Sequence, residues 1–128
     1  MYNTCTRTGL LLNPDFPAFA ATPDAIITCD CCGKGCLEVK CPYSLKDMSI
    51  LEFEKQKSSC LMINDQGEMT LDYRHAYFFQ IQLQMAISKT SYCDFVVWSF
   101  NDFFVERIQF NEDFLFHHLE LAKQFHKK

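Results

Sequence analysis

An acid and a base, Glu38 and Lys40, lie two residues apart in the largely apolar segment CLEVKCPYS at residues 36–44. On a β-strand, residues i and i+2 point to the same face, so the carboxylate and the amine would lie side by side. A second acid, Asp24, directly precedes the apolar segment AIITC. If the two segments form a hairpin in the right register, the two acids meet across it.

Two carboxylates a few ångströms apart repel each other unless a cation lies between them. Mg²⁺ suits this position because it prefers oxygen ligands and keeps several waters. An ion held by Asp24 and Glu38 can promote the attack of water on phosphorus, and Lys40 can assist either as a base or as a charge that stabilises the transition state. The less specific alternative is a surface salt bridge between Glu38 and Lys40, with Asp24 in a turn.

The surrounding segments predict a mixed α/β fold. Short runs rich in β-formers, bounded by turn residues, predict five strands, at residues 9–12, 24–29, 36–40, 93–99 and 103–110. Helical patterns begin at the candidate N-caps Ser44 and Asn111 and predict helices over 44–57 and 111–126. The turn DCCGKG at 30–35 should close the hairpin that carries the charged residues, and a second small hairpin is expected over 61–72.

The segment RHAYFFQIQLQMAIS at residues 74–88 is ambiguous in its period. The alternation of Gln80, Gln82 and Gln84 with apolar residues is typical of a strand. The run is nevertheless about 15 residues long, has no breaker and is rich in helix formers, which favours a helix. On that helix Tyr77, Gln80 and Gln84 share one face, while Gln82 points elsewhere.

Four of the eight cysteines fall in the segment CDCCGKGC. A zinc-stabilised adaptor would use all four as ligands, namely Cys29, Cys31, Cys32 and Cys36. We favour free thiols that line a hairpin, because no C-x2-C pair stands at each end and because Cys31 and Cys32 would face opposite ways on a strand. With no signal-peptide pattern at the N-terminus, we expect reduced thiols in an intracellular protein, cytoplasmic or nuclear according to its host.

Composition bounds the remaining possibilities. The 128 residues are 48% hydrophobic and 22% charged, which suits one globular domain with a modest core. No apolar run approaches the roughly 20 residues of a membrane helix, so we expect no membrane partner. The net charge of −4 excludes a globally basic surface for nucleic acid, so any anion-binding surface must be local.

Four blocks occur in a characteristic order: ATPDAI, LEVKCPYS, YFFQIQLQM and CDFVVW. Together they resemble the YqaJ-like viral recombinase, or lambda-type alkaline exonuclease, family of the PD-(D/E)xK nuclease superfamily. The resemblance covers roughly residues 9–125. It implies a restriction-endonuclease-like fold, in which helices flank a mixed central β-sheet, and a single nuclease domain over residues 1–128.

The same resemblance implies roles for individual positions. Asp24 and Glu38 correspond to the metal-binding carboxylates, and the backbone carbonyl of Val39 corresponds to a further ligand. Lys40 corresponds to the catalytic lysine, and Gln80 to the active-site glutamine.

Three further positions are implied to lie along bound DNA. Thr22 stands where the family often has serine, and Lys46 stands where relatives place a basic residue near the DNA backbone. Tyr77, one helical turn before Gln80, is expected to face the same cleft, with a plain core aromatic as the alternative.

The implied activity is hydrolysis of phosphodiester bonds by an exonuclease that acts 5′ to 3′ on duplex DNA ends during recombination. The implied cofactor is Mg²⁺, with Mn²⁺ as a substitute. The implied partners are linear duplex DNA ends, further copies in a homo-oligomer and a single-strand annealing protein. The alternative function is a catalytically impaired remnant of the nuclease fold that binds DNA or a protein.

Two departures from the family pattern qualify this expectation. Ala25 takes the place of the usual glycine after the aspartate, which alters the start of that strand. The family's N-terminal helices, one of which supplies a further acidic ligand, have no counterpart before the TGL segment, and the first acid is Asp15. We therefore expect a domain that lacks those helices and that binds metal poorly, lacks activity, or depends on residues outside this chain.

Overall fold

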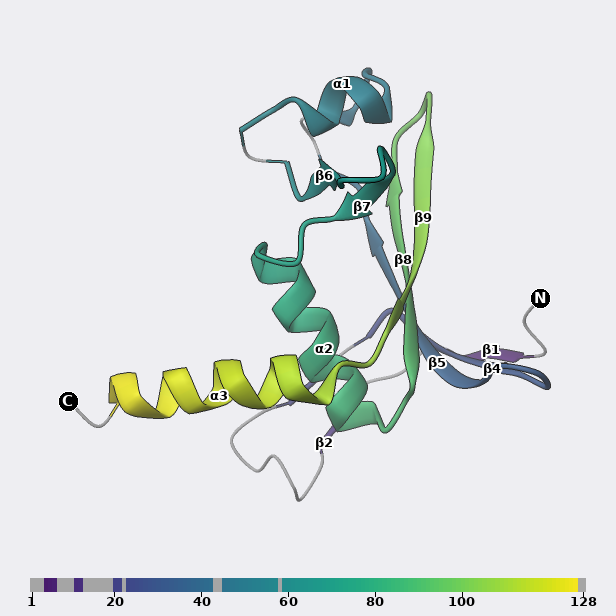
Figure 1. Cartoon of the computed structure of the whole chain (residues 1–128). Coiled ribbons are helices and arrows are strands. Elements are labelled where there is room, and N and C mark those ends of the chain that lie inside the picture. Colours follow the sequence, from purple (N-terminus) through teal and green to yellow (C-terminus); the bar gives the residue numbers. More distant parts are fainter. Residues whose placement is uncertain are drawn as a thin grey trace.

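A mixed five-stranded sheet forms the centre of the protein (Figure 1). This computed structural model describes the backbone of residues 4–6, 11–12, 20–21, 23–42, 45–57 and 59–126, and the side chains of 23–42, 45–57 and 59–121. The strands in spatial order are β1 (Thr4–Thr6), β4 (Ala25–Cys29), β5 (Gly33–Lys40), β8 (Tyr92–Trp98) and β9 (Phe103–Gln109). β5 and β8 are parallel and the other neighbours are antiparallel, which confirms the predicted mixed sheet.

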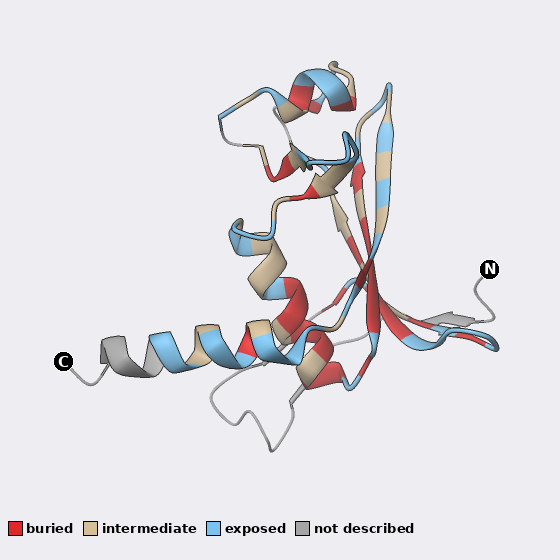
Figure 2. Ribbon diagram, in the orientation of Figure 1, coloured by how far each residue is buried: buried red, intermediate tan, exposed pale blue. Residues whose placement is uncertain are grey.

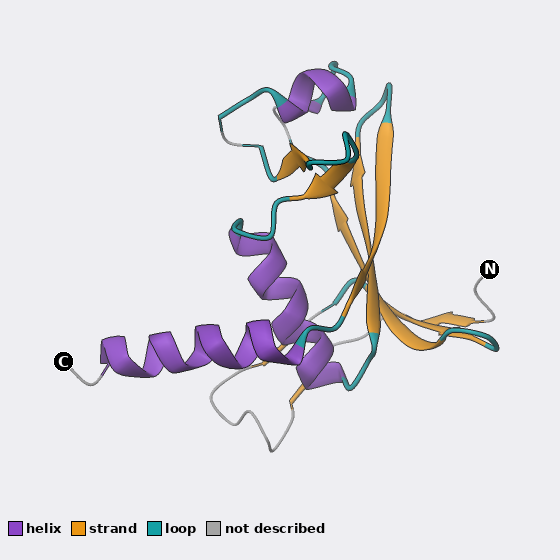
Figure 3. Cartoon of the chain, in the orientation of Figure 1, coloured by secondary structure: helices purple, strands orange, loops and turns teal. Residues whose placement is uncertain are grey.

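The helices lie on one side of this sheet (Figure 3). α2 (Ala76–Ser88) packs against the sheet, and α3 (Glu112–His126) crosses α2, with Phe114 against Phe78, and extends away. α1 (Ile50–Glu54) and the small hairpin of β6 (Leu61–Ile63) and β7 (Met69–Leu71) lie beyond the N-terminal end of α2. The helices predicted over 74–88 and 111–126 and the hairpin predicted over 61–72 are thereby confirmed.

The core lies between the central strands and α2, as the burial colours of Figure 2 show. Alternate residues of β8, Cys93, Phe95 and Val97, are fully buried. They belong to the same apolar cluster as Ile81 and Met85 of α2. Burial of apolar side chains from both elements therefore holds α2 against the sheet.

The β4–β5 hairpin is tighter than predicted. Its loop contains only residues 30–32, because Gly33 already pairs with Cys29 and begins β5. Gly33 has a φ of 79°, in the left-handed region that glycine adopts without steric cost. A three-residue loop followed by such a glycine is a common hairpin connection, so β5 starts three residues earlier than the predicted strand over 36–40.

One predicted strand of the central sheet is wrong. β2 (Leu11–Leu12), within the predicted strand over 9–12, pairs with β3 (Ala20–Ala21) in a separate two-stranded sheet. The edge of the central sheet is instead β1, in the segment TCT, whose threonines are good strand formers.

The helix predicted over 44–57 is shorter than expected. α1 begins at Ile50, and its N-cap is Ser49, whose Oγ accepts a hydrogen bond from the Glu52 N–H at 3.2 Å. The Ser49 hydroxyl also donates to Glu52 Oε1 at 3.2 Å, so serine and glutamate at the capping-box spacing contact each other, which is a stronger start signal than a lone serine. The predicted cap, Ser44, lies outside the described residues.

Within the described part of the chain, no helix is both long enough and apolar enough to cross a membrane.

Gly35 generates a prediction about stability. A Cβ at this position would overlap the buried ring of Tyr92 on the neighbouring strand. Gly35→Ala should therefore lower the free energy of unfolding, measured by urea denaturation, by about 1–3 kcal/mol. Lys34→Ala, at the exposed neighbouring position, is the control and should change it by less than about 0.5 kcal/mol. Equal stability of the two variants would contradict the expected clash.

Candidate functional site

Asp24 and Glu38 face each other across the β4–β5 hairpin. The register pairs Ala25 with Leu37, which puts Asp24 opposite Glu38. The Asp24 N–H donates to the Leu37 carbonyl at 3.1 Å, so the pairing continues one residue beyond β4. The Val39 N–H donates to Asp24 Oδ2 at 2.7 Å, which fixes the Asp24 carboxylate beside β5. The two acids therefore lie together on the hairpin.

The Glu38 carboxylate is almost fully removed from water, with 4% of the residue exposed. Burial raises the pKa of Glu38, and the nearby charge of Asp24 acts in the same direction. Lys40 and a hydrogen bond from Gln84 oppose the rise without cancelling it. Glu38 is thus a carboxylate whose negative charge is only partly compensated.

Lys40 is held between β5 and α2. Its Nζ lies 3.5 Å from Glu38 Oε2 and 4.5 Å from the centroid of the Tyr77 ring. Tyr77 in turn packs against Phe95 of β8, with ring centroids 6.4 Å apart. An ion pair on one side and an aromatic face on the other restrict where the ammonium group can lie.

Gln84 is the glutamine of α2 whose side chain contacts Glu38, whereas the family resemblance implied a site role for Gln80. It is buried, and its Nε2 donates to Glu38 Oε2 at 3.3 Å, while its Oε1 is buried with no hydrogen-bond partner among the described residues. Its backbone carbonyl accepts from Ser88 Oγ at 2.7 Å. The signal that pointed to it was its place on the same helical face as Tyr77 and Gln80.

The other two glutamines of α2 have different surroundings. Gln80 is exposed, and none of the hydrogen bonds described links it to Glu38 or Lys40. Gln82 is fully buried, where its Nε2 donates to the Gln109 carbonyl at 3.1 Å and its Oε1 accepts from the Asn111 N–H at 2.7 Å. Gln82 therefore joins α2 to the segment between β9 and α3.

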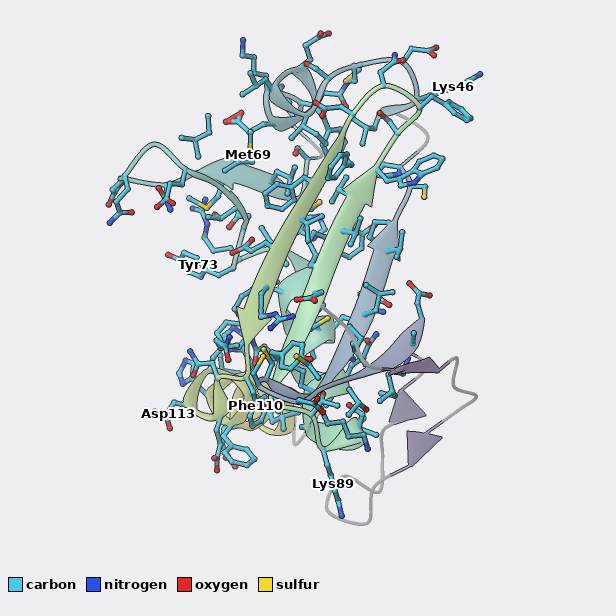
Figure 4. The ribbon with its side chains drawn as sticks, turned by 90° about the vertical axis from the view of Figure 1, so that its right-hand side faces the viewer. Lys46, Met69, Tyr73, Lys89, Phe110 and Asp113 are labelled. Carbon is cyan, nitrogen blue, oxygen red and sulfur yellow. The ribbon has the colours of Figure 1, made fainter. Side chains whose placement is uncertain are left out.

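The implied DNA-facing positions are more dispersed. Tyr77 lies at the site, in contact with Lys40. Lys46 is exposed in the turn after β5, and Figure 4 shows it beyond the C-terminal end of that strand, with its side chain directed outward. Thr22 lies outside the described residues.

The donor set fits a hard divalent cation. The two carboxylates, Asp24 and Glu38, supply oxygen ligands from neighbouring strands, and Val39 places a peptide group beside them. The raised pKa of Glu38 indicates that nearby groups do not fully balance its negative charge, and among the described residues the Oε1 atom of Gln84 has no hydrogen-bond donor. A cation bound between the two acids would balance the negative charge.

Comparisons with known proteins relate this chain to one family and to two solved structures. The model of the YqaJ-like viral recombinase domain matches residues 1–91. A structure of an alkaline exonuclease, LHK-Exo from Laribacter hongkongensis, is similar with 20% identity and a TM-score of 0.54, and the match covers 97% of this chain and 61% of that chain. LHK-Exo in complex with dAMP is similar with 24% identity and a TM-score of 0.58, over 92% and 52% of the two chains.

These structural matches show that this chain and LHK-Exo share a fold. This chain spans between 52% and 61% of the length of LHK-Exo. None of the curated proteins matches the sequence.

The buried Glu38 carboxylate predicts a pH effect on stability in the presence of a chelator. Its pKa is raised in the folded state, so ionisation of Glu38 opposes folding. The contribution of protonated Glu38 to the free energy of unfolding is therefore complete below the unfolded-state pKa of about 4.3 and is lost as the pH rises through the folded-state pKa. Glu38→Gln removes the ionisation. The unfolding free energy of the variant relative to wild type should therefore increase as the pH rises above about 4.3.

The control for this experiment is Glu68→Gln, which alters an exposed side chain between β6 and β7. Glu106, whose pKa is also raised by burial, is present in every variant and cancels from the comparison. Urea titrations across the pH range give the difference directly. A difference between Glu38→Gln and wild type that stays constant with pH would show that Glu38 is adequately compensated without a metal.

Proposed function

The chain belongs to the YqaJ-like viral recombinase domain family, and we propose that it carries the metal-binding centre of a deoxyribonuclease. The observation that carries the proposal is the convergence of Asp24, Glu38 and Lys40 on the α2 side of the β4–β5 hairpin. Two acids and an amine in this arrangement suit the hydrolysis of a phosphodiester bond. The exonuclease fold of the structural relatives supports the same class of reaction.

The proposed substrate is the end of a linear DNA duplex, cleaved in the 5′-to-3′ direction during recombination. The solved complex of LHK-Exo contains dAMP, a deoxynucleoside monophosphate of the kind that an exonuclease releases. That complex supports a nucleotide product for this chain as well. The proposal treats residues 1–128 as one nuclease domain, and it extends to assembly with further copies and to a single-strand annealing protein as a partner.

The proposed metal ligands are Asp24, Glu38 and the backbone carbonyl of Val39, and the proposed ion is Mg²⁺, with Mn²⁺ as a substitute. When bound, the ion would withdraw negative charge from the phosphate oxygens and favour ionisation of the attacking water. Gln84 acts on this site through Glu38, because its amide fixes the position of Oε2. Gln84 is thus a positioning residue.

Lys40 is proposed to stabilise negative charge at the scissile phosphate. Its Nζ is attracted by the Glu38 carboxylate and by the face of Tyr77, and both contacts suit an ammonium group. A lysine held in this way presents a point charge to a phosphate oxygen. This geometry supports charge stabilisation over proton abstraction, the other role that the sequence allowed.

Gln80 and Lys46 are proposed to contact DNA. Gln80 is exposed on the helical face that also carries Tyr77 and Gln84, so it lies on the strip that leads into the site. Lys46 is exposed at the same end of β5 as Lys40 and can meet the backbone of a bound duplex. Thr22, two residues before Asp24, remains part of the proposed DNA surface.

The proposal predicts Mg²⁺-dependent release of nucleotides from linear duplex DNA. Asp24→Asn, Glu38→Gln and Lys40→Ala should each lower the rate by about a hundredfold to ten-thousandfold, because each removes a ligand or a charge used in the transition state. A gel or acid-soluble nucleotide assay measures the rate. Lys34→Ala, which removes an exposed lysine from the far end of the same strand, should keep the wild-type rate.

The outcome that contradicts the proposal is a wild-type chain that binds duplex DNA without Mg²⁺-dependent cleavage. That result would favour the alternative, a nuclease-fold module with a binding role only. Activity that persists in Lys40→Ala would place the chemistry elsewhere.

The two glutamines on the site-facing side of α2 predict different kinetic effects. Gln84→Ala should raise the Mg²⁺ concentration needed for half-maximal cleavage by about tenfold, because Glu38 loses the donor that orients it. Gln80→Ala should raise KM for DNA and leave the Mg²⁺ requirement unchanged, because its exposed side chain is proposed to meet substrate. Gln66→Ala, in the exposed turn between β6 and β7, is the control. The reverse pattern would place Gln80 at the metal and Gln84 in a purely structural role.

A further inference from the structure

Three thiols gather at the tip of the β4–β5 hairpin. Cys29 ends β4, and Cys31 and Cys32 lie in the three-residue loop that follows. The Sγ atoms of Cys29 and Cys31 are 3.3 Å apart, those of Cys31 and Cys32 are 3.5 Å apart, and all three lie within 4.8 Å of one another. Neighbouring cysteines would diverge on a strand, but the tight loop turns them to the same side.

The fourth cysteine of this segment does not join them. Cys36 is fully buried on β5, and its thiol interacts with that of Cys93 on β8. The four-thiol zinc site considered from the sequence is therefore wrong. What the hairpin presents instead is a cluster of three thiols, of which Cys31 and Cys32 are exposed.

The spacing of the three sulfur atoms suits a thiophilic metal ion. Zn–S bonds of about 2.3 Å in a tetrahedral site separate neighbouring sulfur atoms by about 3.8 Å. The Cys29–Cys31 and Cys31–Cys32 separations of 3.3 and 3.5 Å are close to that value and the third pair lies within 4.8 Å, so side-chain adjustments would complete the geometry. Three thiolate ligands leave a fourth position open to solvent.

The surroundings of the cluster favour ionisation of Cys29, whereas hydrogen bonds to Cys29 and Cys32 raise the pKa of Cys31. Hydrogen bonds from the Cys31 thiol and from the backbone N–H groups of Cys31 and Cys32 lower the pKa of Cys29 to about 7. The guanidinium of Arg107 lies next to Cys32, in a position fixed by its two contacts with Asp94 at 2.8 and 3.0 Å. Because the Arg107 charge is already paired with Asp94, the guanidinium offers Cys32 a hydrogen-bond donor rather than a net positive charge.

We propose that Cys29, Cys31 and Cys32 form a binding site for a soft metal ion of the zinc class, with three thiolate ligands and one open position. The site is separate from the proposed catalytic centre, because six residues of extended strand, about 20 Å, separate Cys32 from Glu38. A metal bound here would fix the free tip of the hairpin whose base carries Asp24 and Glu38.

The test is a titration of the purified chain with Zn²⁺ against a chromophoric chelator, in a non-thiol reductant. Cd²⁺ is the second probe, because its thiolate charge-transfer absorption reports sulfur ligands directly. We expect one tightly bound ion per chain and a Cd²⁺–thiolate absorption. The double variant Cys31→Ser/Cys32→Ser alters only exposed side chains and should lose about a hundredfold or more in Zn²⁺ affinity and most of the absorption.

Two controls separate this site from other thiols and from the carboxylates. Cys41→Ser removes an exposed thiol outside the cluster and should bind Zn²⁺ as wild type does. Glu38→Gln should keep the Cd²⁺–thiolate absorption, so the result does not depend on the proposed nuclease function. A wild-type chain without the absorption, or a folded Cys31→Ser/Cys32→Ser variant that retains it, would overturn the proposal.

Discussion

The arrangement of the site depends on a carboxylate that has been taken out of water. Glu38 lies beneath α2 with a lysine and an amide as its immediate partners, and they leave its pKa raised. Burying an ionised group costs free energy unless charges and hydrogen bonds replace its hydration. Gln84 belongs to a longer buried polar chain, since its carbonyl accepts from Ser88, which contacts Thr90. The packing of α2 therefore leaves part of the negative charge of Glu38 unbalanced at the point where a cation would fit.

The topology explains why α2 reaches this carboxylate. β5 and β8 are adjacent and parallel, so the chain must cross over between them, and the crossover contains α2. α2 thereby packs on the strands that carry the acids, and its apolar face fills the core with Ile81 and Met85. The same packing turns Tyr77 and Gln84 towards Lys40 and Glu38. One connection thus builds the core and supplies part of the site.

Local sequence patterns predicted the central strands β4, β5, β8 and β9, the helix α2, and the convergence of Asp24 with Glu38. These features depend on spacing within one hairpin or one helix. Which glutamine contacts Glu38 was harder to predict, because the helical period places Gln80 and Gln84 on one face and only packing decides which of them is buried. The free thiols expected along the hairpin are present, but their close approach could not be predicted, because it depends on a turn of three residues and on the positive φ of Gly33. Short elements such as β1 carry too few residues for a clear pattern.

Gln82 has a consequence for the mechanics of the site. It lies roughly on the opposite flank of α2 from Gln84, since two residues of helix advance by about 200°. Both polar atoms of its amide are engaged by backbone groups next to α3. Rotation of α2 about its own axis would break these hydrogen bonds, so they oppose that rotation. The two Gln82 hydrogen bonds thus fix the rotation of α2 about its axis, and with it the positions of Tyr77 and Gln84 on the opposite side of the helix.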